Sequence, residues 1–398
     1  MVKTRELYYE DQYMSCFDSE VISCEEGGDG SFYVVLERTA FFPEQGGQSS
    51  DTGIIERRDK SKVRVLHTSI QDGIITHRTD GALTPGETVH GEIDFEHRFS
   101  NMQQHTGEHI FSGIVRSRLG YENVGFHLSD SEVTMDYSGP ISESEIKEIE
   151  LIVNRAIWEN VPVRCWFPSD EELANMDYRS KKELSGDIRI VTIEGYDVCA
   201  CCAPHVRRSG EIGLLKVIKT SSNKGGVRVS ILCGKRALEY LDSQQKLISN
   251  LIGLLTTGQD KIYESVKRLI GENAALRGDL SSLRRELIDY ELENIDETLS
   301  DVFLVKEDGL DGNIMKSIVN KLSEKHGGYC GVFSGSDDKG YRYMVVSGGD
   351  NRDAGNIQQI LSDEYSARGG GKPNMIQGSL PSVNIADVIE KIRVKTGQ

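Results

Sequence analysis

The sequence predicts an α+β protein of several domains, and three features carry this prediction. Residues 1–92 alternate short strand patterns with glycine-rich turns, residues 93–237 mix strand and helix patterns, and residues 262–290 carry a heptad repeat. With 398 residues, the chain is also too long for one ordinary hydrophobic core. We therefore expect four domains, at 1–92, 93–237, 238–297 and 298–398.

The N-terminal 92 residues predict a small β-barrel. Alternating runs such as residues 31–36 follow glycine-rich turns such as residues 27–30. Many short strands with turns at close intervals are typical of small barrels.

Residues 93–237 predict an α+β core. Apolar side chains recur at helical spacing from Phe99 to Val115, and a second helix is expected at 143–158. Strands are expected at 188–193, 213–218 and 226–232, and the glycine-rich turn between the last two indicates a hairpin.

Residues 262–290 predict one long helix with a coiled-coil seam. Its seam side chains recur at alternating steps of four and three, with Asn273 at an a position, a device that fixes register and strand number in paired helices. Two explanations remain open: a homodimer through this segment, or a helical hairpin with residues 236–256 of the same chain. The seam consists of Ile262, Val266, Leu269, Asn273, Leu276, Leu280, Leu283, Leu287 and Tyr290.

The C-terminal segment, residues 298–398, alternates short strands with helices and predicts a separate α/β domain. It contains the run Arg368, Gly369, Gly370, Gly371, Lys372. Three glycines between two cations would let backbone amides and positive charges approach a phosphate together, so this run is a candidate RNA-binding site. A glycine turn with incidental cations is the simpler alternative.

Composition and charge narrow the function classes. The apolar share of 37% and charged share of 27% indicate a folded, soluble protein. Neither a signal peptide nor an apolar run long enough for a membrane span is found, so we expect a cytoplasmic protein without membrane contact. A net charge of −17 argues against a protein that binds nucleic acid over its whole surface. The charge does not exclude a local basic face.

Two segments predict a metal site. His105 and His109 are one helical turn apart and would place two imidazoles on the same helix face. Residues 198–205 supply Cys199, Cys201, Cys202 and His205, and Pro204 places these ligands on a loop. Nitrogen and sulfur ligands in this number suit zinc, whereas three thiols within four residues are poorly spaced for disulfides. Buried cysteines acting as small hydrophobic side chains are the alternative.

The order of these motifs resembles the editing domain of alanyl-tRNA synthetases. The order resembles even more closely that of their free-standing relatives, the AlaX proteins. Within that family it is most similar to the long class, which retains a coiled segment and the synthetase C-terminal domain. The resemblance covers nearly the whole chain. The matching stretches are 39–48 with 51–53, 105–109, 201–206 with 209–213, 225–234, and 368–378.

The resemblance implies a role for each motif. The implied zinc ligands are His105, His109, Cys201 and His205; Cys199 and Cys202 leave open which sulfur binds, and the spacing to His205 favours Cys201. The implied catalytic residues are Thr39, which would bind a seryl hydroxyl, Gln48, which would orient water or ribose, and Glu108 as a candidate general base. Glu108 stands where the synthetases often have threonine, so a solvated helix-face glutamate is the alternative, and Gln45 stands where the family commonly has glycine.

The implied function is hydrolysis of alanine tRNA that carries serine or glycine. A synthetase pocket for alanine excludes the smaller glycine poorly and rejects an added hydroxyl by only about a hundredfold, so a second, hydrolytic site is needed. The C-terminal domain would hold the tRNA away from its acceptor end. Because the chain begins directly at the β-rich part, we expect no domain for alanine activation.

Two other functions remain as alternatives. Residues 105–109 also satisfy the His-x-x-Glu-His pattern of a class of zinc metalloproteases, although such proteases use a carboxylate as the third ligand. A non-catalytic tRNA-binding protein with a structural zinc is the other alternative.

Overall fold

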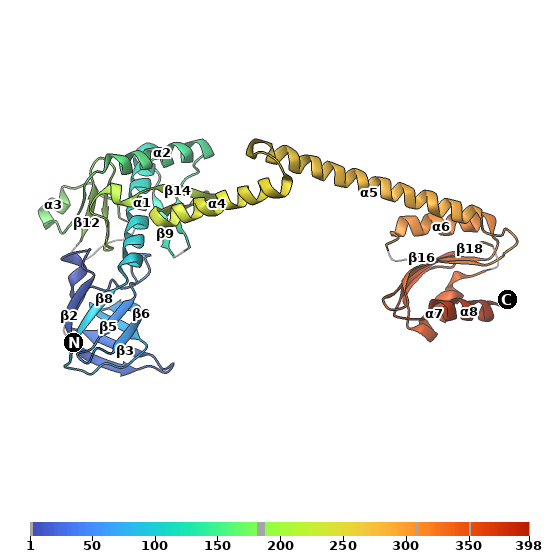
Figure 1. The fold of residues 1–398 in the computed structure, drawn as a ribbon, viewed down its shortest axis with the longest axis horizontal. Helices are drawn as coiled ribbons and strands as arrows, with labels where there is room; N and C mark the ends of the chain where they lie inside the picture. Colours follow the sequence, from blue (N-terminus) through green and yellow to red (C-terminus); the bar gives the residue numbers. More distant parts are fainter. Residues whose placement is uncertain (1–2, 130, 181–187, 307–308, 350–351, 398) are drawn as a thin grey trace. The chain divides into compact units, whose positions relative to one another are not determined.

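The computed structural model describes residues 3–129, 131–180, 188–306, 309–349 and 352–397, in two compact units, Met1–Leu251 and Ile252–Gln398. Both units combine helices with β-sheet, so the predicted α+β class is confirmed (Figure 1). The finer division into four domains stays a prediction. Among the described helices, none combines the length and apolar character needed to cross a bilayer.

The first unit begins with a closed six-stranded barrel, as predicted, in the strand order β2-β3-β7-β6-β5-β8. Side chains alternate between the barrel core and solvent; along β2, Phe17, Ser19 and Val21 are buried and their neighbours exposed. A short parallel pair, β1 and β4, lies beside it. The strands are β1 (Arg5–Glu6), β2 (Cys16–Glu26), β3 (Phe32–Leu36), β4 (Arg38–Thr39), β5 (Gly53–Glu56), β6 (Lys62–Gln71), β7 (Ile74–Thr79) and β8 (Thr88–Ile93).

Helix α1 (Phe95–Leu119) follows the barrel directly. The Asp94 carboxylate accepts a hydrogen bond from the backbone N–H of His97, and Gly120 closes the helix in the left-handed conformation. From Asn101 to Val115 every residue of this helix is buried, on all sides. Such a helix must lie between other elements, and its polar side chains must find partners within the protein.

Two small sheets and helix α2 surround α1 and complete the core of the first unit. One sheet has the order β14-β15-β10-β9 and contains the expected β14–β15 hairpin; the other has the order β11-β12-β13. The elements are β9 (Asn123–Leu128), β10 (Val133–Tyr137), α2 (Glu143–Glu159), β11 (Val163–Trp166), α3 (Asp170–Ala174), β12 (Ile190–Ile193), β13 (Asp197–Ala200), β14 (Leu215–Asn223), β15 (Gly226–Cys233) and α4 (Gly234–Leu255).

The second unit contains one long helix, α5 (Ile262–Glu293), and a five-stranded sheet of order β16-β17-β18-β20-β19. Helix α6 packs on one sheet face, against Val332, Met344 and Val346, and α7 and α8 pack on the other (Figure 1). The elements are β16 (Val302–Lys306), α6 (Gly312–Lys325), β17 (Tyr329–Ser336), β18 (Gly340–Ser347), α7 (Ala354–Tyr365), β19 (Arg368–Lys372), β20 (Met375–Leu380) and α8 (Ile385–Thr396).

The run Arg368–Lys372 is not the glycine turn that the sequence left open as an alternative to an RNA-binding site. It forms β19, an exposed edge strand that pairs antiparallel with β20. A Cβ atom at Gly369 would lie 2.4 Å from the Gln377 carbonyl oxygen, and one at Gly371 would lie 2.1 Å from that of Met375. Glycine is therefore needed at these two positions for close packing of the strand pair.

Candidate metal centre

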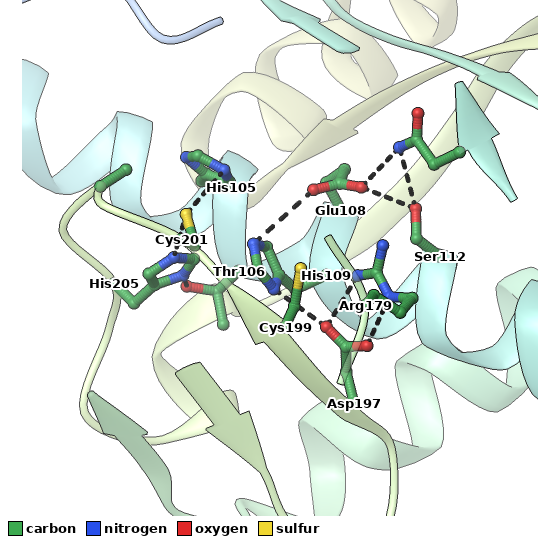
Figure 2. Close-up of polar contacts among 12 residues, drawn as sticks. His105, Thr106, Glu108, His109, Ser112, Arg179, Asp197, Cys199, Cys201 and His205 are labelled. Atoms are coloured by element: carbon green, nitrogen blue, oxygen red, sulfur yellow. Dashed lines mark hydrogen bonds and ion pairs between the residues drawn. The ribbon is translucent and has the colours of Figure 1, made fainter. Parts of the chain in front are cut away.

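Four side chains converge where α1 meets the loop that follows β13. His105 and His109 come from the helix, Cys201 and His205 from the loop, and their donor atoms all lie within 4.8 Å of one another (Figure 2). The Cys201 Sγ is 3.6 Å from His105 Nε2 and 3.5 Å from His205 Nε2. The structure thus brings together the two segments in which the sequence predicted metal ligands.

Each imidazole is oriented by a hydrogen bond at its Nδ1 atom. The Nδ1–H group of His105 donates to Gln48 Oε1 over 2.8 Å, and that of His205 donates to Thr106 Oγ1 over 3.0 Å. His109 Nδ1–H donates to Asp197 Oδ2 over 2.9 Å. Donation from Nδ1 leaves the lone pair on Nε2, so all three rings present the same nitrogen to the centre.

The donor set fits zinc. Zinc–nitrogen bonds near 2.0 Å and zinc–sulfur bonds near 2.3 Å place nitrogen and sulfur roughly 3.5 Å apart in a tetrahedral shell. The observed sulfur–nitrogen distances of 3.5 and 3.6 Å match this separation. Burial raises the pKa of the Cys201 thiol well above its ordinary value, and a divalent cation beside it would favour the thiolate instead.

Asp197 links the metal centre to a buried arginine. Arg179 donates to both oxygens of the Asp197 carboxylate, Nε to Oδ1 and Nη2 to Oδ2, each over 2.7 Å. Both side chains are almost fully buried. Burial alone would raise the pKa of Asp197, but hydrogen bonds from His109 and Arg179 hold it below its usual value. The carboxylate therefore stays charged and holds the His109 ring in one orientation.

The ligand loop is held by Arg189 and Gln12. The Arg189 guanidinium donates to the carbonyl oxygens of Cys201 and Ala203 over 2.9 and 2.8 Å, and to Gln12 Oε1 over 3.1 Å. Gln12 Oε1 also accepts the backbone N–H of His205 over 2.5 Å. The N-terminal segment thus positions the loop whose side chains face the helix.

The two other thiols take different places. Cys199 is buried and forms a second close group with His109 and Asp197. Since Arg179 already occupies both oxygens of that carboxylate, the group with Cys201 is the better metal site. Cys202 lines the adjoining cavity, where a Cβ atom on Gly46 would lie 3.3 Å from its sulfur.

A cavity of about 860 Å³ adjoins the metal centre, and His105, His109 and Cys201 lie in its wall. Three aromatic residues, Tyr9, Phe126 and Phe167, line it as well. Its further lining includes Gln45, Gly46, Gly47 and Arg189. Gly46 and Gly47 have φ values of 64° and 84°, which favour glycine and bring bare backbone to the cavity.

Two glutamine side chains near the metal centre hold buried donors without partners in the described residues, and of the two only Gln45 lines the cavity. The Nε2 atoms of Gln45 and Gln48 have no hydrogen-bond partner in the described part of the chain. A buried amide donor without a partner costs free energy, which a polar ligand could recover. Gln48 thus holds His105 through Oε1 and keeps a buried N–H group without a partner in the described residues.

Thr39 is not among the described residues that line the cavity. Its hydroxyl lies in the barrel, where it donates to His77 Nε2 over 2.9 Å and accepts the backbone N–H of Phe41 over 3.1 Å. The protein itself uses both hydrogen-bonding functions of this hydroxyl. The placement gives no support to the sequence expectation that Thr39 binds the substrate hydroxyl.

Glu108 is fully buried rather than a solvated helix-face residue. Its Oε1 accepts hydrogen bonds from Ser112 over 2.6 Å and from Asn123 over 2.7 Å (Figure 2). Its Oε2 is 3.9 Å from His109 Nε2. Glu108 is absent from the described cavity lining, although its Oε2 lies near the metal-facing nitrogen of His109.

Sequence reasoning named Gln48 only for water or ribose, and it missed the other residues that orient the ligands and their loop. Asp197 lies four residues before Cys201. An acidic residue just before a ligand loop is at most a weak indication of a hydrogen-bond partner for a metal ligand. No recognisable sequence motif contains Arg179, Arg189 or Gln12. They reach the site only because the chain folds back on itself.

Three family models match the chain. The model for tRNA synthetases class II (A) matches residues 2–97, the threonyl and alanyl tRNA synthetase second additional domain matches residues 188–230, and the DHHA1 domain matches residues 300–396.

Curated alanine–tRNA ligases are similar along most of the chain. The ligase of Pyrococcus furiosus is 32% identical over 98% of this chain and 43% of its own length. The ligase of Ignicoccus hospitalis is 32% identical over 80% of this chain and 36% of its own length. The ligase of Thermococcus kodakarensis is 29% identical over 99% of this chain and 44% of its own length. The chain therefore spans less than half the length of these relatives.

Proposed function

Because the chain is an AlaX-like, alanyl-tRNA synthetase-related protein, we propose that it hydrolyses the ester of alanine tRNA mischarged with serine, with glycine as a second substrate. The observation that carries this proposal is the convergence of His105, His109, Cys201 and His205 at the wall of one cavity. A separate hydrolytic site can recognise a hydroxyl that an alanine pocket rejects poorly.

The cavity suits the 3′ end of an aminoacylated tRNA. Its volume of about 860 Å³ is within the range of sites that enclose a ligand of this size. Tyr9, Phe126 and Phe167 offer aromatic surface on which the terminal adenine can stack. A peptide substrate has no comparable use for these rings.

The residues around the reacting ester have separate tasks. His105, His109, Cys201 and His205 would hold zinc, which supplies Lewis acidity toward a substrate oxygen when bound. The unpaired Nε2–H group of Gln48 can donate to the attacking water or the ribose. The bare backbone of Gly46 and Gly47 lets the substrate approach the wall closely.

Selection of serine requires a partner for its hydroxyl. Gln45 lines the cavity, and its Nε2–H group is buried without a partner in the described chain. We assign the hydroxyl contact to Gln45, because Thr39 is already bonded to His77. Alanyl-tRNA and glycyl-tRNA both leave this donor unsatisfied, which disfavours both relative to seryl-tRNA.

The second unit supports a tRNA partner and a homodimer in this proposal. On α5 the seam side chains after Ile262 are exposed, with 66% exposure at Leu276 and 62% at Leu283. A heptad seam of this kind with Asn273 at an a position is suited to a parallel partner helix. We propose that two copies associate through residues 262–290 and that the C-terminal domain holds the tRNA.

The test is a deacylation assay with seryl-, glycyl- and alanyl-tRNA side by side, with zinc measured in the same samples. We expect rapid release of serine, much slower release of alanine, and about one zinc ion per chain. His109→Ala and Cys201→Ser should lose both zinc and activity, and Gln45→Ala should lose the preference for serine.

Cys16→Ser provides the matched control, because Cys16 is an exposed thiol on the barrel. It should keep zinc and activity. Equal hydrolysis of seryl- and alanyl-tRNA, or full activity of Cys201→Ser, would contradict the proposal. Binding of tRNA without any deacylation would identify a non-catalytic tRNA-binding protein instead.

A further inference from the structure

One carboxylate lies in the wall of the cavity beside the metal centre. Glu6 ends the short strand β1 and is partly buried. It is the only acidic residue among the described residues that line this cavity. The carboxylate belongs neither to the group of candidate metal ligands nor to the hydrogen bonds that orient their rings. Its place at the wall makes it available to a ligand in the cavity.

The Tyr8 hydroxyl fixes the position of this carboxylate. Tyr8 is fully buried, and its hydroxyl donates a hydrogen bond to Glu6 Oε1. The Tyr8 ring belongs to one apolar cluster with Phe42, from the segment after β4, and Ala203, from the ligand loop. Burial, above all, raises the pKa of Tyr8, so the phenol stays protonated and remains a donor. Glu6 is thus held where the segment after β4 meets the ligand loop.

No described side chain neutralises the charge of Glu6. Tyr8 donates to Oε1, and no lysine, arginine or histidine in the described part of the chain forms an ion pair with Glu6. The preceding residue, Arg5, pairs with Glu10 instead. The only lysine or arginine in the described cavity lining is Arg189, and its guanidinium donates to two carbonyl oxygens of the ligand loop. Water screens a charge less in a partly enclosed cavity than on an open surface, so this carboxylate attracts a cation.

The 3′ end of an aminoacylated tRNA carries one positive group. The amino acid is attached through its carboxyl group, so its α-amino group stays free and is protonated in large part near about pH 7. The adenine and the ribose hydroxyl are neutral, and the phosphate is anionic. The α-ammonium group lies one carbon from the reacting ester carbonyl. It is therefore the one part of this substrate whose charge matches the carboxylate in the cavity wall.

We propose that Glu6 binds the α-ammonium group of the aminoacyl ester, so that the site accepts tRNA esters with a free amine and rejects N-acylated esters such as peptidyl-tRNA. An N-acyl group replaces the ammonium by a neutral amide, which removes the charge-assisted hydrogen bond and leaves the carboxylate without a cation. Seryl, glycyl and alanyl esters all carry the ammonium, so Glu6 selects the class of ester and Gln45 selects the side chain. The inference rests on the proposed function, which supplies the ester.

The test compares kcat/KM for the hydrolysis of seryl-tRNA and N-acetyl-seryl-tRNA by the full chain. The wild-type protein should favour the free amine by roughly ten- to a hundredfold. Glu6→Gln should lose most of this preference, because it slows hydrolysis of seryl-tRNA and leaves that of the N-acetyl ester nearly unchanged. The glutamine amide oxygen still accepts from Tyr8, so the melting temperature and the zinc content should stay at wild-type values. Glu10→Gln is the matched control, since Glu10 is an exposed carboxylate outside the described cavity lining.

A second measurement does not depend on hydrolysis. Isothermal titration calorimetry with 3′-(L-seryl)amino-3′-deoxyadenosine, a stable amide analogue of the ester, is compared with the same compound after N-acetylation. The wild-type protein should bind the free amine more tightly by a similar factor, and Glu6→Gln should bind the two compounds about equally.

Equal hydrolysis of the two esters by the wild-type protein would overturn the inference and leave the editing proposal standing. An equal loss on both esters in Glu6→Gln would also overturn it, because the carboxylate would then serve the ribose hydroxyl or the attacking water. If no ester is hydrolysed, the proposed function alone fails, and the calorimetric comparison still decides whether Glu6 binds the ammonium group.

Discussion

At the scale of single residues, the three imidazoles are oriented by partners from three different segments. Gln48 lies between β4 and the barrel strand β5, Thr106 lies on α1 itself, and Asp197 begins β13. The rings therefore reach a common orientation only when the barrel, the helix and the small sheet are all folded. Substitution of such hydrogen-bond partners typically lowers metal affinity by about ten- to a hundredfold.

Asp197→Asn should weaken zinc binding by roughly ten- to a hundredfold. The amide cannot supply the negative charge that holds both His109 and Arg179, so the His109 ring loses its fixed tautomer. Competition with a chelator measures this change without reference to catalysis. Asp177→Asn, at an exposed carboxylate paired with Arg116, should bind zinc like the wild type. Unchanged zinc affinity in Asp197→Asn would refute a positioning role for Asp197.

His77 should make the stability of the first unit depend on pH. Burial lowers the pKa of His77 to about 4, whereas an unfolded histidine titrates near 6.5. Between these values the unfolded state binds more protons, so the free energy of unfolding falls as the pH drops from about 6.5 toward 4. The fall amounts to at most roughly 3 kcal/mol, and above about pH 6.5 the contribution is fully present.

Urea unfolding at several pH values, followed by the fluorescence of Trp158 and Trp166, measures this dependence, because both tryptophans lie in the first unit. His77→Gln should flatten the dependence between about pH 6.5 and 4. His90→Gln serves as the control, since it changes an exposed barrel histidine and leaves the buried ring in place. A slope identical in wild type and His77→Gln would show that another group is responsible.

At the scale of elements, the first turn of α1 is attached to the segment that forms the cavity wall. Arg98 is fully buried, and its guanidinium donates to the Asp51 carboxylate and to the carbonyl oxygens of Ala40 and Gln12. Asp51 also accepts the backbone N–H of Phe42 over 2.6 Å. The segment that carries Gly46, Gly47 and Gln48 is thereby held against the helix that carries the histidines.

Arg98→Met should lower the free energy of unfolding by about 3–5 kcal/mol, because it leaves the Asp51 carboxylate buried without its cation. Adding Asp51→Asn to this variant should restore part of the loss. Chemical denaturation of the three proteins measures the coupling. Arg64→Ala, which breaks an exposed ion pair with Asp80, should cost less than about 1 kcal/mol. A similar small cost for Arg98→Met would mean that the buried pair does not join the two elements.

At the scale of the whole molecule, α5 presents an apolar seam that its own unit does not cover. Ile288 and Leu292 pack against α6, but Leu280, Leu283 and Leu287 remain at least half exposed. Burial of leucines in a helix pair is favourable by about 25 cal/mol per Å² of apolar surface. This is the physical basis of the proposed homodimer.

The wild-type protein should sediment as a dimer, and Leu276→Asp combined with Leu283→Asp should sediment as a monomer, because two charges would enter the apolar seam. Ala275→Asp combined with Ser282→Asp places the same charges at the same spacing outside the seam and should keep the dimer. Analytical ultracentrifugation distinguishes these states. A monomeric wild-type protein would leave the hairpin within one chain as the explanation of the repeat.

The sequence by itself determined the features that depend on neighbouring residues. The α1 pair His105 and His109, the β14–β15 hairpin and the continuous helix α5 all follow from short-range spacing. Only the tertiary structure decided what surrounds them: that Asp197 and Arg179 hold His109, that Thr39 faces His77, and that Arg368–Lys372 is an edge strand. The side-chain contacts join residues up to 88 positions apart. Although β19 pairs with its neighbour β20, the close packing of backbone and buried polar groups that selects these arrangements has no local pattern in the chain.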